Sequence, residues 1–407
     1  MALGRCRPDF SRGSRPTIVV GVTHAQTCMI LGTRLRNLRM AGFRVVLIAS
    51  PGELLERVAA QAEVEFLALP MERGIAPLAD WVSLLRLLRV LRRIRPQIAE
   101  FSTPKAGFLG MLAAILCGVP KRIYLLRGLR LETVLGWKRQ VLLWTERIAC
   151  ACAHTVLCNS ESLRARAVGL CLVPESKIDI LGRGSSTGVD LERFCPGSSP
   201  VRRRVGSDEN HHVIGFVGRM TVDKGLPELI GAFEAITEDD PQARLLLVGW
   251  FDDAEDLVDD DLRRRIEANP RIHCTGLVYD TAPYYRAMDV MVLPTWREGF
   301  PNVVLEAQAS GIPVITTIST GSRDSIVPEV TGLLIPPGYQ SAIAESVRRL
   351  LRDRALRQRM GVAARVWVGE HFADRWILHL NAEFYKDLSE SLWAEKRTAQ
   401  AESANFA

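Results

Sequence analysis

The segment VIGFVGRMTVDKGLPELIGAF (213–233) decides the fold class of this chain. Its first six residues are a short apolar run that ends at Gly218, which predicts a buried strand. Apolar residues at helical spacing begin after Gly225, and a polar turn separates the two patterns. A strand that passes through a short turn into a helix is typical of α/β folds built on a parallel sheet.

The same alternation extends in both directions from this segment. Leu/Arg-rich helices are expected at 79–95 and from about 341 to 390, and periodicity is lost after about 392, where we expect the chain to fray. The strands form two groups, so we predict two Rossmann-like α/β domains that face each other across a deep cleft. The further strands are expected at 16–23, 43–50, 64–70, 97–103, 122–128, 154–160, 243–249, 271–276, 290–295, 313–317 and 332–336.

A chain of 407 residues is long enough for two domains, and its composition suggests where they divide. The alternation stops in ERFCPGSSPVRRRVGSDENHH (192–212), which is rich in Pro, Gly, Ser and charge. The predicted division is a basic N-terminal extension (1–15), an acceptor domain (16–195), a linker (196–210), a donor-binding domain (211–375), and a C-terminal helix with a frayed tail (376–407).

Charge and cysteine content restrict the partners and the compartment. The net charge is only +6, which suits anionic ligands or an anionic membrane surface, and we expect no nucleic-acid partner. The N-terminus lacks the apolar region of a signal peptide, and no apolar run approaches the ~20 residues that cross a bilayer. The nine cysteines are an odd number and do not suggest a disulfide framework. We therefore expect a cytoplasmic protein, either soluble or peripheral on the inner face of the plasma membrane.

One cysteine cluster raises the question of a metal. Cys150, Cys152, His154 and Cys158 lie close together, but the run IACACAHTVLC is typical of a buried helix that leads into a strand. No second pair of ligands stands at the spacing of a zinc ribbon. We expect neither a metal nor a cofactor.

The segment WREGFPNVVLEAQASGIPV (296–314) carries the first chemical pattern. Gly299 permits close approach of a ligand, and Pro301 suits the first position of a helix whose free amides attract a phosphate. Glu298 in the loop can accept a hydrogen bond from a sugar hydroxyl, and Glu306 further along the helix can accept both hydroxyls of a ribose. The alternative is a solvated loop glutamate and a surface helix glutamate.

The turn after residue 218 carries the second pattern. Arg219 and Lys224 follow the strand at its carboxyl end, where ligands bind in open α/β sheets. A planar guanidinium and a point-charge ammonium together suit a pyrophosphate. The alternative for each residue alone is a solvated basic side chain.

These patterns resemble glycosyltransferase family 4, whose members are retaining enzymes of GT-B fold. The motif G-R-x4-K-G is matched at 218–225 and E-G-F-x-N-x3-E at 298–306, with further similarity at Asp289 and 331–338. The resemblance implies that Arg219 and Lys224 bind the donor diphosphate, Glu306 the ribose and Glu298 the transferred sugar. The implied catalytic residues are Arg219, Lys224 and Glu298, and the implied donor-binding residues are Gly218, Arg219, Lys224, Glu298, Gly299, Phe300, Asn302, Val303 and Glu306.

The first domain resembles a narrower group, which extends undecaprenyl-diphosphate-linked glycans in bacterial surface-polysaccharide or glycoprotein pathways. The similar stretches are 102–114, 124–139 and 182–194. Many relatives carry a Gly-Gly loop after the first strand, whereas this chain has GVTHAQTCMILG (21–32). Four side chains at strand ends or in the following loops are assigned to the acceptor and its diphosphate: His24, Lys105, Arg127 and Arg130.

The expected activity is therefore retaining transfer of a hexose or N-acetylhexosamine from a nucleotide-diphosphate sugar, UDP-linked by family habit, to a lipid-linked or polysaccharide acceptor. Two alternatives stay open, a nucleotide-sugar epimerase-like GT-B enzyme and a non-catalytic GT-B partner protein. A dehydrogenase would need G-x-G-x-x-G after its first strand, and PTIVVGVTHAQT lacks that pattern. The Arg-rich helix at 81–96 either lies on anionic lipid or packs its leucines on the sheet with its arginines in solvent.

Overall fold

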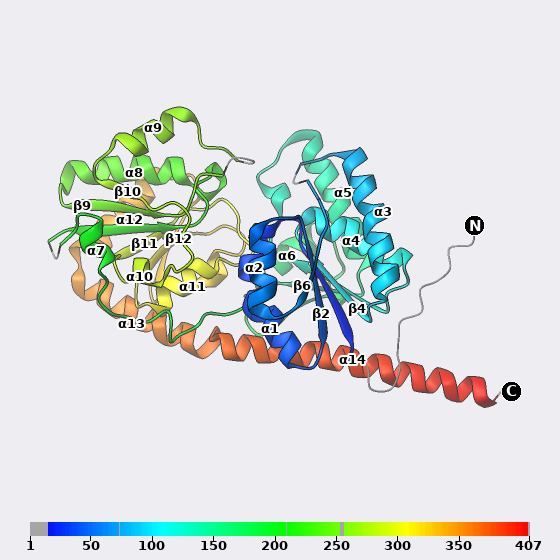
Figure 1. The fold of residues 1–407 in the computed structure, drawn as a ribbon. Coiled ribbons are helices and arrows are strands. Elements are labelled where there is room, and N and C mark those ends of the chain that lie inside the picture. The colour runs from blue at the N-terminus through cyan, green and yellow to red at the C-terminus, as the bar shows by residue number, and fades with distance from the viewer. Residues whose placement is uncertain (1–14, 73, 209, 253–255, 406–407) are drawn as a thin grey trace. The chain divides into compact units, whose positions relative to one another are not determined.

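The computed structural model describes residues 15–72, 74–208, 210–252 and 256–405, which form two compact α/β units (Figure 1). Among the described residues, unit 1 comprises 15–159, 164–182 and 377–405, and unit 2 comprises 160–163 and 183–376. Each unit has its own parallel sheet, and this confirms the predicted fold class.

Unit 1 contains a seven-stranded sheet in the order β3-β2-β1-β4-β5-β6-β7. Every pair is parallel, and the strands at the centre are buried on both faces, as their continuous apolar sequences predict. The strands are β1 (Thr17–Gly21), β2 (Arg44–Ala49), β3 (Glu65–Ala68), β4 (Ile98–Ser102), β5 (Lys121–Leu126), β6 (Thr155–Cys158) and β7 (Ile178–Ile180).

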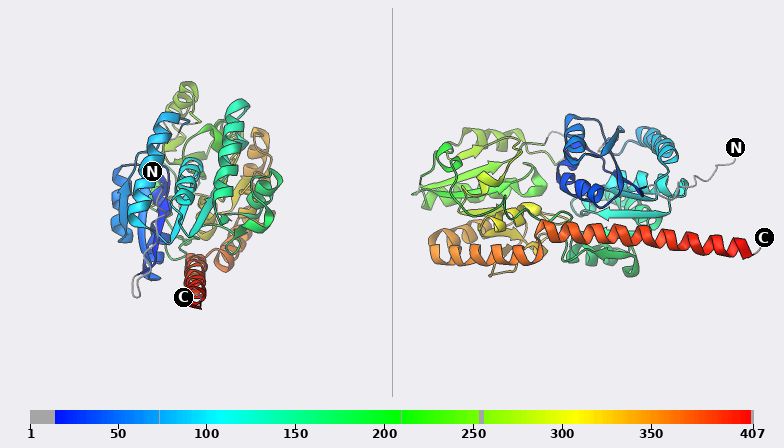
Figure 2. Two further views of the ribbon diagram at one scale, coloured as in Figure 1. Left: turned by 90° about the vertical axis from the view of Figure 1, so that its right-hand side faces the viewer. Right: turned by 60° about the horizontal axis from the view of Figure 1, so that its bottom comes forward.

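The helices of this sheet fall into two layers (Figures 1 and 2). Successive strands run outward from β1 to β3 and then in the opposite direction from β4 to β7, so right-handed connections place α1 and α2 on one face and α3, α4 and α5 on the other. The helices are α1 (Gly32–Met40), α2 (Glu53–Ala62), α3 (Pro77–Ile94), α4 (Pro104–Leu116), α5 (Gly136–Cys152) and α6 (Glu161–Gly169), with short 3₁₀ turns η1 (Ala25–Ile30), η2 (Arg130–Glu132) and η3 (Glu175–Lys177). The order of the strands reverses between β1 and β4, which is where ligands bind in such sheets.

Unit 2 repeats the plan with six parallel strands in the order β10-β9-β8-β11-β12-β13. Its order reverses between β8 and β11, so both motif-bearing loops begin at the reversal point. The strands are β8 (His212–Val217), β9 (Ala243–Val248), β10 (Ile272–Cys274), β11 (Val290–Leu293), β12 (Val314–Thr317) and β13 (Gly332–Ile335). The helices are α7 (Val201–Arg204), α8 (Leu226–Asp239), α9 (Asp260–Ala268), α10 (Ala282–Tyr285), α11 (Asn302–Ala309), α12 (Gln340–Arg352) and α13 (Arg354–His371), with 3₁₀ turns η4 (Val222–Lys224) and η5 (Arg323–Ser325).

The predicted linker at 196–210 is instead part of unit 2. Val201 in α7 is buried in the core of that unit, and the guanidinium of Arg202 binds the carboxylate of Asp289 at 3.0 Å and three backbone carbonyls. The compact units divide after residue 182, before the predicted boundary at 195. The Pro, Gly and Ser residues correctly predict that much of this segment has irregular backbone. Such a segment can still pack on the core of a domain when it contains a buried apolar residue, as this one does at Val201.

The C-terminal helix α14 (Asp374–Asn405) continues past the point where fraying was expected. It returns to unit 1, where Tyr385 is fully buried in the core. Arg34 of α1 donates to both carboxylate oxygens of Glu100 at 2.5 and 2.6 Å, to Asn381 at 2.9 Å and to the Tyr385 hydroxyl at 2.8 Å. This buried network holds α14 to the sheet.

Candidate functional site

The turn after β8 is shaped by close contact between backbones. The amide of Gly218 donates to the carbonyl of Val248 at 2.9 Å, and Gly249 has φ +146°. A Cβ atom on Gly249 would lie only 1.8 Å from the Gly218 carbonyl oxygen, so only glycine fits there. The contact fixes the direction in which Arg219 leaves the sheet.

A second close contact joins this turn to the loop that follows β11. Gly225 has φ +74°, and a Cβ atom there would lie 2.1 Å from the carbonyl oxygen of Pro294. The two loops thus meet, and the ammonium of Lys224 forms an ion pair with the carboxylate of Glu298. Both side chains keep about 15% of their surface exposed, so a ligand can still reach them.

Arg219 belongs to the same cluster. Its Nη1 donates to Asp252 at 2.5 Å, and Asp252 is buried. Burial alone would lower the pKa of Arg219, but the hydrogen bond that it donates to Asp252 and the charges of Asp223 and Glu298 raise it. The structure therefore brings Arg219, Lys224 and Glu298 together, and we call these three residues the cationic cluster.

Three charged residues around this cluster were missed by the sequence reasoning. Arg297 forms ion pairs with Asp223 at 2.9 Å and with Asp256 at 3.3 Å. Burial raises the pKa of Asp223, but the charges of Lys224 and Arg297 outweigh it, so the net shift is downward. Arg297 and Asp223 each stand next to a motif residue in the sequence, and that adjacency was the available signal. Asp252 gave no such signal, because it follows β9 and is not next to a motif residue in the sequence.

The beginning of α11 is fixed by a loop from earlier in the chain. The side chain of Asn302 accepts from the hydroxyl of Ser185 at 2.9 Å and donates to Thr187 at 2.8 Å. The stretch 182–194 was predicted to belong to the first domain, but from Arg183 onward it belongs to unit 2. Gly321 approaches from the other side, where a Cβ atom would lie 2.5 Å from the Gly299 carbonyl oxygen.

Two motif residues occupy less accessible positions than expected. Pro301 is the capping residue in extended conformation, and the helix begins at Asn302, one residue later than predicted. Phe300 is only 8% exposed, and its ring lies 5.2 Å from that of Phe372. The aromatic ring therefore supports the loop from beneath, while Val303 is partly buried beside the core of unit 2.

Glu306 lies one turn into α11. Its Oε2 accepts from the buried Tyr285 hydroxyl at 2.8 Å and from Thr281 at 3.4 Å. Burial raises the pKa of Glu306 to about 7, although the hydrogen bond from Tyr285 opposes the shift. A carboxyl that ionises near neutrality beside a ligand-binding loop is typical of functional positions.

The predicted acceptor residues follow three neighbouring strands of unit 1, namely β1, β4 and β5. His24 caps η1, and its Nδ1 accepts from the amide of Gln26 at 3.3 Å. Lys105 in the first turn of α4 pairs with Asp80 at 2.6 Å. Arg130 begins η2. Strands of a parallel sheet end at one edge, so these residues share the carboxyl edge of unit 1.

Arg127 is the least compensated of the four. Its Nε and Nη2 are buried and have no hydrogen-bond partner among the described residues. Burial lowers the pKa of this guanidinium to about 10, with a further decrease from the charge of Arg34. Buried donors are normally satisfied, so two unused ones at a strand end indicate a place for an anion.

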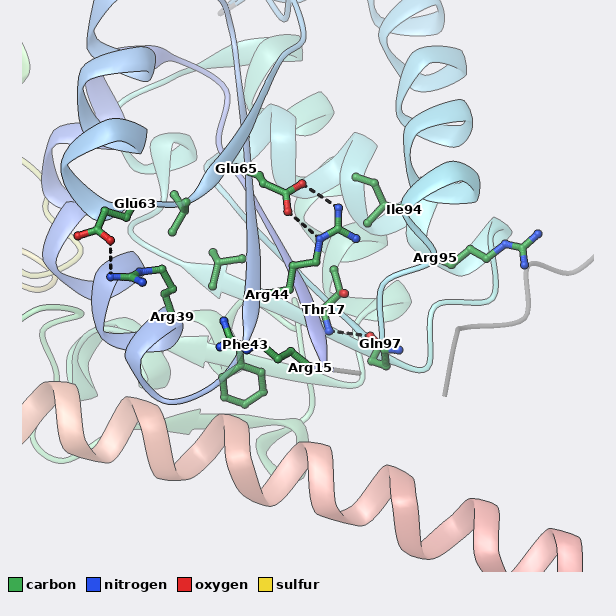
Figure 3. Close-up of a pocket in the computed structure, with 12 residues that line it drawn as sticks. Arg15, Thr17, Arg39, Phe43, Arg44, Glu63, Glu65, Ile94, Arg95 and Gln97 are labelled. Atoms are coloured by element: carbon green, nitrogen blue, oxygen red, sulfur yellow. Dashed lines mark hydrogen bonds and ion pairs between the residues drawn. The ribbon is translucent and has the colours of Figure 1, made fainter. Parts of the chain in front are cut away.

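A pocket of about 480 Å³ lies at the opposite edge of the same sheet (Figure 3). Its lining includes Thr17 and Arg44 at the amino ends of β1 and β2, together with an Arg39–Glu63 ion pair of 2.8 Å. Arg44 is bound to Glu65 at 2.7 Å through two nitrogens. These charges are paired within the protein, and the pocket is separate from the candidate site.

Among the described residues, no three His, Cys, Asp or Glu side chains gather in a way that could hold a metal ion. The described part of the chain also contains no helix with the length and apolar character to cross a membrane.

Comparison with known proteins identifies the class to which this fold and site belong. Residues 34–184 match the family model of the glycosyl transferase 4-like domain, and residues 211–353 match that of glycosyl transferases group 1. The chain belongs to this glycosyltransferase family and is a glycosyltransferase with the GT-B fold.

Three similar proteins illustrate the relationship. The chain is 36% identical to the capsular polysaccharide biosynthesis glycosyltransferase CapM of Staphylococcus aureus over 88% of this chain and 93% of that one. It is 28% identical to the UDP-Gal:alpha-D-GlcNAc-diphosphoundecaprenol alpha-1,3-galactosyltransferase of Escherichia coli over 70% and 74% of the two chains. Sucrose-phosphate synthase from Thermosynechococcus elongatus has the same fold, with a TM-score of 0.77 at 19% identity, over 93% of this chain and all of the other.

Proposed function

We propose that this glycosyltransferase moves a hexose or N-acetylhexosamine from a UDP-sugar, with retention of configuration, to a lipid-linked or polysaccharide acceptor of a capsule or another surface glycan. The observation that carries the proposal is the cationic cluster at the strand reversal of unit 2. Arg219 and Lys224 supply positive charge there, and α11 begins at Asn302, in the segment that follows Glu298.

Both cations keep donors for a diphosphate although each is paired within the protein. An ammonium has three N–H donors and a guanidinium has five, so Lys224 can hold Glu298 and a phosphate oxygen together, and Arg219 can do the same with Asp252. Departure of the nucleoside diphosphate places negative charge on its terminal oxygens. The two cations and the first amides of α11 would stabilise that charge without a metal.

The two glutamates would recognise the sugars on either side of the diphosphate. The Glu298 carboxylate, held by Lys224, can accept a hydrogen bond from a hydroxyl of the transferred sugar. Glu306 would accept the hydroxyls of the ribose. In a retaining reaction the acceptor hydroxyl attacks the anomeric carbon from the face on which the diphosphate departs.

The acceptor assignment rests on the carboxyl edge of unit 1. The unpaired nitrogens of Arg127 suit a diphosphate, which is the group that joins undecaprenol to the sugar in the acceptor of the Escherichia coli relative. Similarity to CapM over most of both chains favours a capsular or related surface glycan.

The test is a transfer assay with purified protein, a panel of UDP-, GDP- and ADP-sugars, and a GlcNAc-diphosphate-prenol acceptor. We expect the release of nucleotide to depend on the acceptor. The anomeric configuration of the product, determined from NMR coupling constants, should be the same as that of the donor. Conversion of the donor to an isomeric sugar without an acceptor would favour the epimerase alternative. Absence of binding to every nucleotide sugar would favour the non-catalytic alternative.

A further inference from the structure

Unit 1 exposes three tryptophan side chains on one layer of helices. Trp81 on α3 is 62% exposed, and Trp137 and Trp144 on α5 are 64% and 60% exposed. Leu78 and Leu135 beside them are 86% and 85% exposed. Single exposed apolar residues are ordinary, but a group of large ones indicates a binding surface.

The tryptophans share one face because of the sheet order. Right-handed connections place α3, α4 and α5 on the same face of the sheet, and α4 packs against both of the other helices (Figure 1). On α3 the exposed Trp81 is followed by Val82, which is also exposed. Val82 begins an exposed stripe that continues at helical spacing through Arg86, Arg89 and Arg93. Arg147 of α5 places its guanidinium 5.4 Å from the centre of the Trp144 ring.

This helix layer also concentrates positive charge. α3, α4 and α5 together contain eight Lys or Arg residues and two carboxylates, Asp80 and Glu146. Asp80 is paired with Lys105, and Glu146 is buried. The layer therefore has a net charge of +6, equal to that of the whole chain, so the remainder of the chain is neutral overall.

On α3 the apolar and basic residues occupy different ends, whereas Lys138 of α5 lies in the same first turn as Trp137. Helices that connect parallel strands run opposite to them, so the first turns of α3 and α5, with Trp81 and Trp137, lie at the carboxyl edge of the sheet. Arg127 follows β5 at this same edge. The arginines of α3 extend toward the other edge.

We propose that this surface, defined by Trp81, Trp137, Trp144, Arg86, Arg89 and Arg93 and called the tryptophan face, docks on a bilayer that contains anionic lipids. Tryptophan is enriched at the boundary between headgroups and acyl chains, and a helix with apolar and arginine-rich segments on its exposed side is typical of proteins that lie on a membrane. The charge complements anionic headgroups, each arginine contributing about a fivefold gain in binding. Docking there would bring the carboxyl edge of unit 1 next to a lipid-anchored substrate.

The test is cosedimentation of the full chain with phosphatidylcholine vesicles that contain or lack about 30 mol% phosphatidylglycerol, at low and high salt. We expect binding to the anionic vesicles that weakens with salt. Arg86→Ala with Arg89→Ala should reduce it by about 30-fold, since two cations are lost. Trp81→Ser with Trp137→Ser should also reduce it, without changing its salt dependence. The matched controls are Trp376→Ser, half-exposed on α14, and Arg263→Ala with Arg264→Ala, exposed on α9.

Several results would overturn the proposal. The wild-type chain could fail to bind anionic vesicles at low salt. The face variants and the control variants could also lose vesicle binding to the same extent. Binding of the face variants that matches wild type would equally refute it, because another surface would then carry the interaction. No donor or acceptor is present in this measurement, so its outcome is independent of the transferase assay. The face variants should also retain activity toward a detergent-dispersed acceptor.

Discussion

Glu306 provides a direct test of the donor site because its ionisation lies near neutral pH. Burial raises its pKa from 4.5 to about 7, even though Tyr285 donates a hydrogen bond to it. Only the carboxylate can accept hydrogen bonds from both hydroxyls of a ribose, so a nucleotide sugar should bind the ionised form. Below pH 7 the ionised fraction falls about tenfold per pH unit, which corresponds to about 1.4 kcal/mol. We therefore expect donor affinity about tenfold weaker at pH 6 than above pH 8.

Isothermal titration calorimetry with UDP-glucose between about pH 5.5 and 8.5 would measure this dependence. The diphosphate of a nucleotide sugar is a diester that keeps its charge over that range, so a pH effect reports on the protein. Glu306→Gln should bind more weakly, with an affinity that does not change through pH 7. Tyr285→Phe removes the hydrogen bond that favours the carboxylate and should move the midpoint to higher pH.

Unit 1 offers a matched control. Glu146 is buried, accepts from the Tyr124 hydroxyl at 2.7 Å and also has its pKa raised to about 7 by burial. Glu146→Gln should therefore leave the pH dependence of donor binding unchanged. The assignment of Glu306 fails if the wild-type affinity is flat through pH 7, or if Glu306→Gln keeps the wild-type pH dependence.

Three further predictions concern turnover and stability. Lys224→Ala should lower turnover at least about 100-fold while circular dichroism stays that of the wild type, since it removes charge stabilisation of the leaving diphosphate; near-wild-type turnover by the folded variant would contradict this role. Gly225→Ala should destabilise unit 2 by at least about 2 kcal/mol in urea unfolding, because it combines a strained φ with a clash at Pro294. At Gly206 φ is also positive but no atom lies within 4 Å of an added Cβ, so Gly206→Ala should lose only the free energy of the backbone strain. Equal losses of stability in the two variants would refute the clash. Glu146 binds a proton more tightly in the folded state, so its contribution to the free energy of unfolding is present below pH 4.5 and is lost as the pH rises to about 7, by at most about 3 kcal/mol. Glu146→Gln should remove this pH dependence from the free energy of urea unfolding. An unchanged pH profile in that variant would rule the prediction out.

The parts of the fold that follow from local pattern could be predicted from the sequence. Each expected strand overlaps an observed one, because a buried parallel strand needs a continuous apolar run. The helix and strand around Cys150 and Cys158 also agree with the prediction. That Lys224 and Glu298 each follow a strand was also predictable, but their ion pair depends in addition on β8 lying beside β11.

Contacts that depend on packing between distant segments could not be predicted. The loop that holds Asn302 comes from residues 185–187, whose small polar side chains give no sign of which core they join. Asp252 binds Arg219 because β9 lies beside β8, and strand order is not encoded in the local sequence. The missed residues are therefore partners of the motif residues rather than parts of a motif.

The buried network around Arg34 shows how such a distant contact bears on the candidate acceptor residues. Glu100 lies on β4, next to β5, and its charge acts on Arg127 just beyond the end of that strand. Both oxygens of Glu100 are bound by Arg34, and Tyr385 of α14 donates to the same carboxylate. The C-terminal helix therefore contacts the carboxylate whose charge acts on Arg127, although two buried nitrogens of Arg127 have no hydrogen-bond partner among the described residues.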